Sequence, residues 1–212
     1  MIEHLKENNY THVELLPITE HPLDASWGYQ VTGYYSPTSR FGKPDELKYL
    51  VDQLHHAGIG VILDWVPLHF CKDAHGLYQF DGSWLYEYPY EHDRENHQWG
   101  TANFDLGKGM TRSFLLSNLK YWLEYFHFDG IRVDALSYLL YWRGETTEDK
   151  INHAAIDFIK RVNAMVHTDY KGVLMIAEDS SSFPKVTHSL EDGGLGFDMK
   201  WDLGWMNDTL KY

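Results

Sequence analysis

Residues 59–66 read IGVILDWV, a near-continuous apolar run with one charged residue, Asp64. Branched apolar residues on both faces of a strand are typical of a parallel sheet that is covered on both sides. The stretch before it, KPDELKYLVDQLHHAG at residues 43–58, predicts a helix, because Pro44 suits its first turn and Gly58 suits its C-terminal cap. Together they predict a helix that leads into a buried parallel strand.

The same alternation of helix and strand recurs along the chain. Helices are predicted over residues 111–128 (TRSFLLSNLKYWLEYFHF) and about 150–167, and strands follow them at 129–136 (DGIRVDAL) and 172–178 (GVLMIAE). At the front, residues 11–18 (THVELLPI) predict a strand that follows the tail of a helix. Repeated units of this kind predict an α/β fold with a parallel sheet and helices that cover it.

The loops of the predicted fold differ in length according to the strand end that they join. Those after the strands at Ile18, Val66 and Leu136 are long and rich in Trp, Tyr, His and Gly, whereas the turns into strands are short. A (β/α)8 barrel builds its site on the loops after its strands. We therefore predict one domain over residues 1–212, a partial (β/α)8 barrel with about five of its eight strands. A doubly wound sheet is the alternative, but no GxGxxG turn follows a strand.

Composition and charge narrow the possible partners and location. The net charge of −13 argues against a nucleic-acid partner, because binding to a phosphate backbone draws on clustered Lys and Arg. No apolar run approaches the roughly 18 residues of a membrane span, and the single Cys71 has no partner for an internal disulfide. We expect a cytoplasmic protein with neither a nucleic acid nor a membrane as partner. The sequence leaves its oligomeric state open.

Charged residues stand at the ends of three successive predicted strands. Arg132 and Asp134 share one face of their strand because residues two apart point the same way. A single pair of this kind is most simply a structural ion pair. However, Asp64 ends the strand before it and Glu178 ends the strand after it. Three carboxylates at one rim of a parallel sheet indicate a functional site.

The surroundings of these carboxylates suggest different tasks for them. The guanidinium of Arg132 is expected to lower the pKa of Asp134, which suits a nucleophile that must be ionised. Glu178 follows the apolar residues Ile176 and Ala177, which suits a general acid that must hold its proton. Enzymes that cleave glycosidic bonds use two carboxyl groups, one with a lowered and one with a raised pKa. A separation of about 5 Å between them favours retention of configuration.

Four short stretches resemble the signature regions of a known family. They are DWVPLHF (64–70), GIRVDAL (130–136), AEDSS (177–181) and WMND (205–208), and in this order they resemble the α-amylase superfamily of retaining glycoside hydrolases and transglycosidases. Residues 14–47 and 193–212 are most similar to its 1,4-α-glucan branching enzymes. This resemblance implies a (β/α)8 barrel, no cofactor, no obligatory metal, and an α-glucan such as amylose or glycogen as partner. The implied reaction transfers an α-1,4-linked chain to a 6-hydroxyl and so forms α-1,6 branches.

The resemblance also implies roles for single residues. Asp134 matches the nucleophile and Glu178 the general acid and base. Asp208 matches a third carboxylate that stabilises the transition state, although by itself an Asp in this context is more simply a helix N-cap. Arg132 matches the arginine that sets the charge of the nucleophile.

Further matches concern the sugar that the site would hold. Asp64 and His69 match the pair that holds the glucosyl unit in the first subsite, and Tyr29 matches an aromatic residue that stacks on the same sugar. Two positions depart from the family pattern: Asn207 replaces the usual His before the third carboxylate, and Leu68 replaces a usual Gly. We expect Asn207 to weaken binding of the transition state, because Asn carries no positive charge.

The sequence leaves two alternative functions open. One is an amylase-type hydrolase of α-1,4-glucans, and the other is a non-catalytic glucan-binding fragment. The resemblance implies that further strands and flanking β-domains are absent, so we expect little activity from the isolated chain.

Residues 86–100 (YEYPYEHDRENHQWG) predict a loop over the cleft, in which Tyr86, Tyr88, Tyr90 and Trp99 either stack on sugars or pack together. Neither this tract nor His55 and His56 has the ligand spacing that favours a metal site.

Overall fold

A five-stranded parallel sheet forms the centre of the computed structural model, which describes all 212 residues. Its strands, in spatial order, are β1 (His12–Leu15), β4 (Gly60–Trp65), β8 (Gly130–Val133), β9 (Leu174–Ala177) and β10 (Met199–Lys200). The predicted parallel α/β arrangement is therefore confirmed, including the strand number. The four strands quoted from the sequence correspond to the first four in this order.

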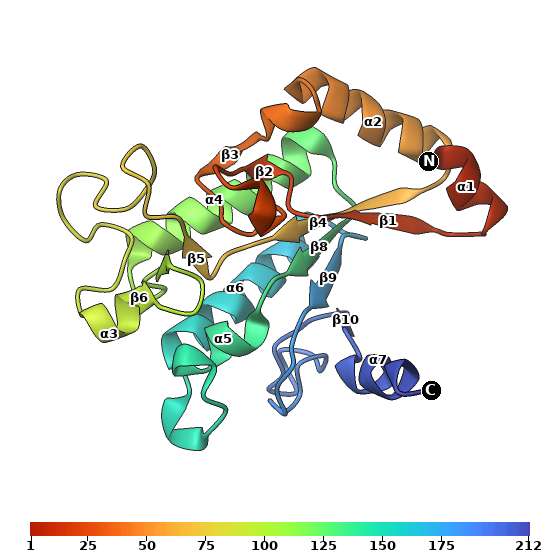
Figure 1. Cartoon of the computed structure of the whole chain (residues 1–212). Coiled ribbons are helices and arrows are strands. Elements are labelled where there is room, and N and C mark those ends of the chain that lie inside the picture. Colours follow the sequence, from red (N-terminus) through yellow and green to blue (C-terminus); the bar gives the residue numbers. More distant parts are fainter.

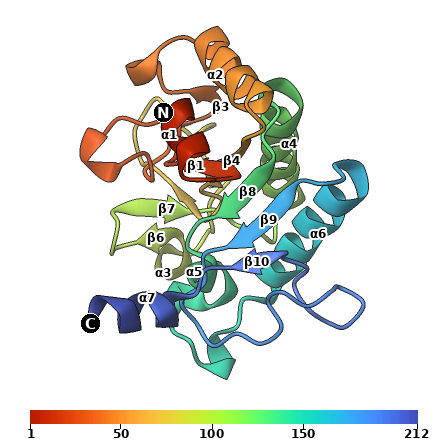
Figure 2. The same cartoon turned by 90° about the vertical axis from the view of Figure 1, so that its right-hand side faces the viewer.

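Three long helices lie on the outer side of the arc of strands (Figures 1 and 2). They are α2 (Pro44–His56), α4 (Gly109–Phe126) and α6 (His153–Asp169), close to the ranges predicted from the sequence. The shorter helices are α1 (Ile2–Glu7), α3 (Glu91–Arg94), α5 (Leu136–Leu140) and α7 (Leu203–Leu210). Figure 2 shows α7 on the opposite side of the strands from α6. No helix combines the length and the apolar character that crossing a membrane requires.

Local signals explain where α2 begins and ends. Pro44 is its first residue, and the Glu46 carboxylate accepts the backbone N–H of Lys43 at 2.7 Å, which satisfies one free donor of the first turn. Gly58 follows the helix with a φ of +75°, a conformation that costs glycine little. This turn sends the chain directly into β4, whose residues after Gly60 are all buried.

Buried polar side chains connect the sheet to α4. The Trp65 indole N–H of β4 donates to the Asn118 side-chain oxygen at 2.8 Å. Asn118 and Trp122 in turn donate to the backbone carbonyl of Tyr34 at 2.6 and 3.0 Å. Because each of these groups lies in the core, the hydrogen bonds fix the position of α4 as well as offsetting the cost of burial.

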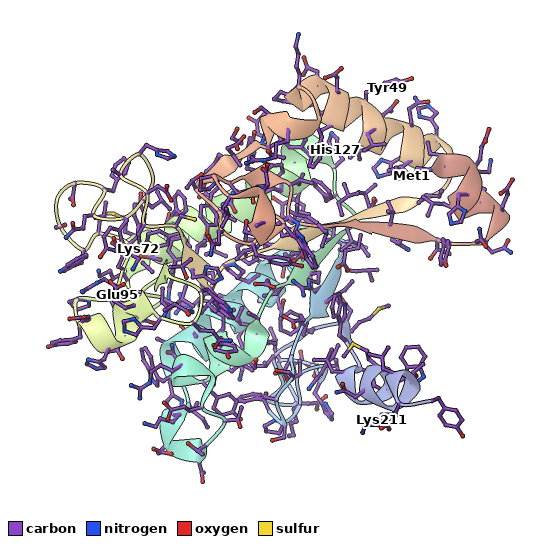
Figure 3. The ribbon with its side chains drawn as sticks, viewed as in Figure 1. Met1, Tyr49, Lys72, Glu95, His127 and Lys211 are labelled. Carbon is purple, nitrogen blue, oxygen red and sulfur yellow. The ribbon has the colours of Figure 1, made fainter.

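The long loops after the strands carry small sheets of their own. One pairs β2 (Thr19–Glu20) with β3 (Gly33–Pro37), and the other orders β5 (His69–Phe70), β7 (Thr101–Asn103) and β6 (Glu95–Asn96). The sequence had predicted only loops in these regions, since strands of two to five residues give too short a periodic signal. An ion pair between Lys72 and Glu95, at 2.8 Å, joins two parts of the second region (Figure 3). These additions hold the long loops over one end of the main sheet (Figure 1).

A repeated side-chain contact ties neighbouring strands together at their N-terminal ends. Asp129, just before β8, accepts the Val61 backbone N–H of β4 at 2.7 Å and contacts His55 of α2 at 2.7 Å. Asp198, just before β10, likewise accepts the Met175 backbone N–H of β9 at 2.7 Å and contacts a histidine of α6 at 3.1 Å. Each aspartate thus joins the strand before it to the helix that precedes that strand.

We expect Asp129→Ala to lower the free energy of unfolding by about 1–3 kcal/mol, because it leaves the buried amide of Val61 without its acceptor. The urea midpoint of unfolding measures the change. Asp129→Asn retains an acceptor oxygen and should restore most of the loss. Asp52→Ala, at an exposed position of α2, is the control and should change stability by less than about 0.5 kcal/mol. Equal effects of the two alanine variants would contradict the prediction.

Candidate active site

One arginine gathers the carboxylates at the C-terminal ends of three strands. Strand register places Asp64 of β4 directly beside Arg132 of β8. Arg132 Nη1 donates to Asp64 Oδ1 and to Asp134 Oδ1, both at 2.6 Å, and its Nη2 lies 3.5 Å from Glu178 Oε2. The four residues expected from the strand pattern therefore lie together, around a guanidinium whose side chain is almost fully buried.

Burial dominates the electrostatics of this cluster. It raises the pKa of Asp134 to about 7, because loss of water outweighs the lowering by Arg132, and the charges of Asp64 and Glu178 raise it further. The expectation that Arg132 would give Asp134 a lowered pKa is therefore wrong in direction. The sequence showed the favourable partner and the two other carboxylates at the same rim, but it did not show how deeply Asp134 is buried.

The backbone beside Asp134 adopts an unusual conformation. Ala135 has a φ of +50°, in the left-handed region that side chains with a Cβ rarely enter. Its N–H donates to Glu178 Oε2 at 2.6 Å, so the turn links the ends of β8 and β9. Nothing in the sequence indicates this turn, because alanine is not a residue that favours a positive φ. Strained backbone of this kind concentrates at functional sites.

Tyr29 and His69 extend the cluster toward the loops. The Tyr29 hydroxyl donates to Asp64 Oδ2 at 2.6 Å, so each oxygen of that carboxylate has a partner. His69 is buried, and burial lowers its pKa to about 4, which leaves the ring neutral at physiological pH. Its Nδ1 atom has no hydrogen-bond partner within the protein. Both residues therefore lie beside the carboxylate cluster, and their contacts with a sugar stay a prediction.

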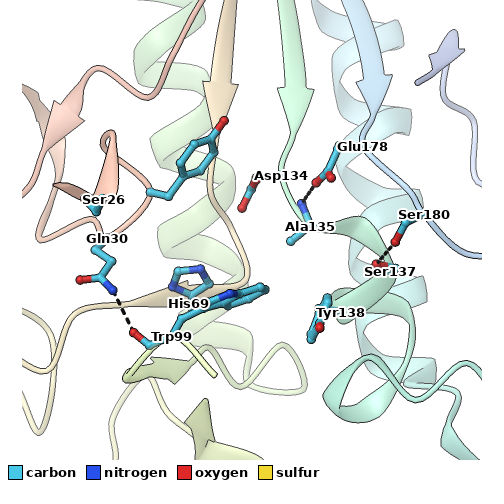
Figure 4. Close-up of a pocket in the computed structure, with 11 residues that line it drawn as sticks. Ser26, Gln30, His69, Trp99, Asp134, Ala135, Ser137, Tyr138, Glu178 and Ser180 are labelled. Carbon is cyan, nitrogen blue, oxygen red and sulfur yellow. Dashed lines mark hydrogen bonds between the residues drawn. The ribbon is translucent and has the colours of Figure 1, made fainter. Parts of the chain in front are cut away.

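These side chains line a cavity of about 360 Å³ at the C-terminal ends of the strands. In Figure 4, Asp134 and Glu178 face this cavity, with Trp99 and His69 on its other side. The rings of Trp99 and Tyr138 lie 4.7 Å apart, and the Tyr138 hydroxyl donates to Gln98 at 2.7 Å. The other lining residues are Ser26, Tyr29, Gln30, Ala135, Ser137 and Ser180. Sequence reasoning missed Tyr138, which stands in a largely apolar stretch and belongs to no motif.

The aromatic tract 86–100 divides between packing and the cavity. Only Trp99 among its four quoted aromatic residues lines the cavity. Tyr86 packs against Phe114, and Tyr88 packs against a tryptophan of the loop after α5, with ring centroids 5.1 Å apart in both cases. Tyr90 is exposed. Packing thus accounts for Tyr86 and Tyr88, whereas stacking on a sugar stays a prediction for Trp99.

Asp208 and Asn207 do not join the site, contrary to the sequence-based expectation. Both lie in α7 and are exposed, and the nearest charged partner of Asp208 is Lys211, at 3.8 Å. Figure 3 shows Lys211 at the end of α7, away from the sheet. The N-cap of this helix is Asp202, whose side chain accepts the Trp205 backbone N–H, so Asp208 is not the cap either. A motif of four residues matched the family pattern by residue type alone, without the strand that would aim the carboxylate inward.

Two further points from the sequence concern Leu68, which departs from the family pattern, and the absence of a metal site. Leu68 is buried in the core rather than placed in the main cavity. His55 pairs with Asp129 at the opposite, N-terminal end of the strands, and His56 lies on exposed helix surface. No three His, Cys, Asp or Glu side chains come together in an arrangement that could hold a metal ion.

Comparison with known proteins identifies close relatives. A family model described as "Alpha amylase, catalytic domain" matches residues 1–99. Proteins named 1,4-alpha-glucan branching enzyme GlgB match the whole chain: 59% identical in Bacillus subtilis (strain 168), 58% in Bacillus caldolyticus and 57% in Geobacillus stearothermophilus. The matched region is 34%, 32% and 33% of those proteins, so the chain spans about a third of their length.

Solved structures resemble the fold at much lower sequence identity. An α-amylase from Geobacillus thermoleovorans, complexed with acarbose, superposes with a TM-score of 0.72 and is 21% identical; the match covers 95% of this chain and 43% of that one. An Anoxybacillus α-amylase superposes with a TM-score of 0.78 at 19% identity, over 98% of this chain and 44% of the other. The chain therefore shares the fold of the matched part of these structures, which agrees with the predicted partial (β/α)8 barrel.

Proposed function

We propose that the chain is the central catalytic segment of a 1,4-alpha-glucan branching enzyme, because a model of the α-amylase catalytic domain matches residues 1–99 and proteins named as such enzymes match the chain along its whole length. The reaction would cleave an α-1,4-linked glucan and transfer the released chain to a 6-hydroxyl. Its substrate would be amylose or the growing glycogen. The observation that carries this proposal is the pair of carboxylates, Asp134 and Glu178, that face one cavity from adjacent strands.

Asp134 is the nucleophile in this proposal. Its ionised oxygen attacks C1 of the glucosyl unit while Glu178 gives its proton to the departing oxygen of the other chain. A single guanidinium contacts both carboxylates, which is compatible with the separation of about 5 Å that a retaining mechanism needs. Arg132 offsets part of the cost of burial, so with a pKa of about 7 a substantial fraction of Asp134 is ionised at neutral pH.

The second half of the reaction uses the same two residues. Glu178 takes the proton from a 6-hydroxyl, the new C1–O6 bond forms, and the bond between C1 and Asp134 breaks. Two inversions at C1 retain its configuration. Asp64, neutral His69 and Tyr29 would hold the glucosyl unit meanwhile, with hydrogen bonds and an aromatic face.

We expect the isolated 212-residue chain to show little turnover of amylose. Its cavity presents two facing carboxylates, because Asp208 lies on the exposed surface of α7. In addition, β1 and β10 have unpaired edges in the sheet, and such edges favour self-association. An assay that follows iodine absorbance and reducing ends together is the measurement, with Asp134→Asn as the blank. Clear turnover that is lost in the blank would contradict this expectation.

The same assay on the longest natural protein that contains this sequence tests the proposed function. Falling iodine absorbance at a constant number of reducing ends is the result expected for branching. One new reducing end for each cut would instead indicate an amylase-type hydrolase. Binding to a glycogen gel without any turnover would indicate a glucan-binding protein. The cytoplasmic location expected from the sequence stays a prediction.

A further inference from the structure

A second cavity, of about 320 Å³, adjoins the first at the ends of β9 and β10. Its walls are residues 179–181, after β9, and residues 200–204, which begin at the last residue of β10. Ser180 lines both cavities, and its hydroxyl oxygen lies 3.2 Å from that of Ser137 in the first one. The two cavities therefore meet at Ser180, two residues after Glu178.

A neutralised ion pair forms one side of this cavity. Asp179 is buried; one of its oxygens accepts from Lys200 Nζ at 2.8 Å, and the other accepts the backbone N–H of Ser181 at 2.9 Å and its hydroxyl at 2.7 Å. Lys200 Nζ also donates to the Ser181 carbonyl at 3.0 Å. An ammonium group has three N–H donors, so one remains for a ligand. The pair carries no net charge, which suits a neutral ligand with hydroxyl groups.

Trp201 and Asp202 add the other elements of a sugar site. The Trp201 ring lies 4.5 Å from the guanidinium carbon of Arg132, the residue that contacts Asp134 and Glu178, and its side chain is partly exposed. An indole face is a large apolar surface of fixed orientation, on which the C–H face of a pyranose can pack. One Asp202 oxygen caps α7, at 2.9 Å from the Trp205 amide, while its other oxygen is available as an acceptor.

We propose that this second cavity binds a glucosyl unit of the acceptor chain, with Trp201 as its stacking surface. The inference rests on the proposed function and deepens it. Tyr29 and His69 lie on the β4 side of Asp134, and they would bind the donor glucosyl unit. The second cavity lies on the other side, beyond Glu178, which protonates the departing oxygen and then deprotonates the incoming one. Trp201 therefore determines how often a glucan hydroxyl, rather than water, receives the transferred chain.

The test compares Trp201→Ala with Trp201→Phe in the longest natural protein that contains this sequence, acting on amylose. We expect the number of reducing ends formed per branch to rise about tenfold in Trp201→Ala and to stay near the wild-type value in Trp201→Phe, since Phe retains an aromatic face. Trp205→Ala is the matched control, because this exposed tryptophan lies in the same segment but outside the cavity. Its ratio should equal that of the wild type.

A structural role for Trp201 predicts a different outcome. If Trp201 only supported Arg132, Trp201→Ala would reduce branching and hydrolysis by the same factor and leave their ratio unchanged. That result, or an unchanged ratio with unchanged rates, would overturn the inference.

A binding measurement separates this inference from the proposed function. With 5-fluorotryptophan incorporated, the ¹⁹F signal of Trp201, identified by its loss in Trp201→Phe, should shift when maltotriose is added. If the Trp201 signal shifts in a protein that neither cleaves nor transfers glucan chains, the inferred binding site stands and the proposed function is refuted. If the protein forms branches, but maltotriose does not shift the Trp201 signal and Trp201→Ala does not change the number of reducing ends per branch, only the present inference is refuted.

Discussion

Asp134→Asn is expected to abolish turnover while leaving glucan binding intact and stabilising the folded protein. Loss of the nucleophile removes the covalent intermediate, so kcat should fall by about 10⁴-fold or more. Asparagine has the same shape and retains an oxygen for Arg132, so retention on a glycogen gel should persist. Iodine and reducing-end assays measure the first effect in the longest natural protein that contains this sequence. Turnover within tenfold of the wild type would exclude Asp134 as the nucleophile.

The stability effect of the same substitution should depend on pH. Folding raises the pKa of Asp134 to about 7 from its ordinary value of 3.8, so the folded state binds this proton more tightly than the unfolded state does. The destabilisation is absent below about pH 4, grows as pH rises toward 7, and is complete above that. Asp134→Asn removes it, with a gain on the order of a few kcal/mol at pH 8. Thermal unfolding at pH 5 and pH 8 measures the difference, and a gain that is larger at pH 5 would contradict this account.

Arg132→Met is expected to cause the largest loss of stability among single substitutions at the site. The variant fills a similar volume, but it leaves Asp64 and Asp134 buried without their shared partner. Removing one member of a buried ion pair costs about 3–5 kcal/mol. The loss should shrink as pH falls, because the two carboxylates then take up protons. Chemical unfolding at several pH values is the measurement.

Two further variants show whether the loss comes from uncompensated charge. Arg161→Met removes an exposed arginine of α6 and should cost less than about 0.5 kcal/mol. The double variant Arg132→Met/Asp134→Asn should be more stable than the sum of its single effects, because it removes one of the stranded charges. Strict additivity would show that Arg132 acts through its packing alone.

The raised pKa of Asp134 and the left-handed backbone of Ala135 are both locally unfavourable, and the surrounding structure maintains them. The surrounding sheet is fully buried at β8, and strand pairing on both sides prevents relaxation of the turn. Sites of this kind lower stability where function requires a fixed, partly desolvated group. The same rigidity holds Glu178 close to Asp134 through the Ala135 amide.

The sequence alone was sufficient for the parallel α/β architecture and for one half of the site. Buried strands such as residues 59–66 and helices with clear start and stop residues give local, periodic signals that tertiary contacts reinforce. Asp64, Arg132, Asp134 and Glu178 were predictable for the same reason: each stands at the end of such a strand, and parallel pairing brings strand ends to one rim.

Only the tertiary structure decided what that rim can do. The pKa of Asp134 depends on how much water is excluded and on carboxylates contributed by other strands, and neither quantity is local. The exposure of Asp208 depends on the direction of α7, which a four-residue motif does not encode. The cavity between Ser180 and Trp201 arises from two loops about twenty residues apart, each without a pattern of its own. Neighbouring residues determine the periodicity of helices and strands, whereas contacts between residues distant in the sequence determine burial and orientation.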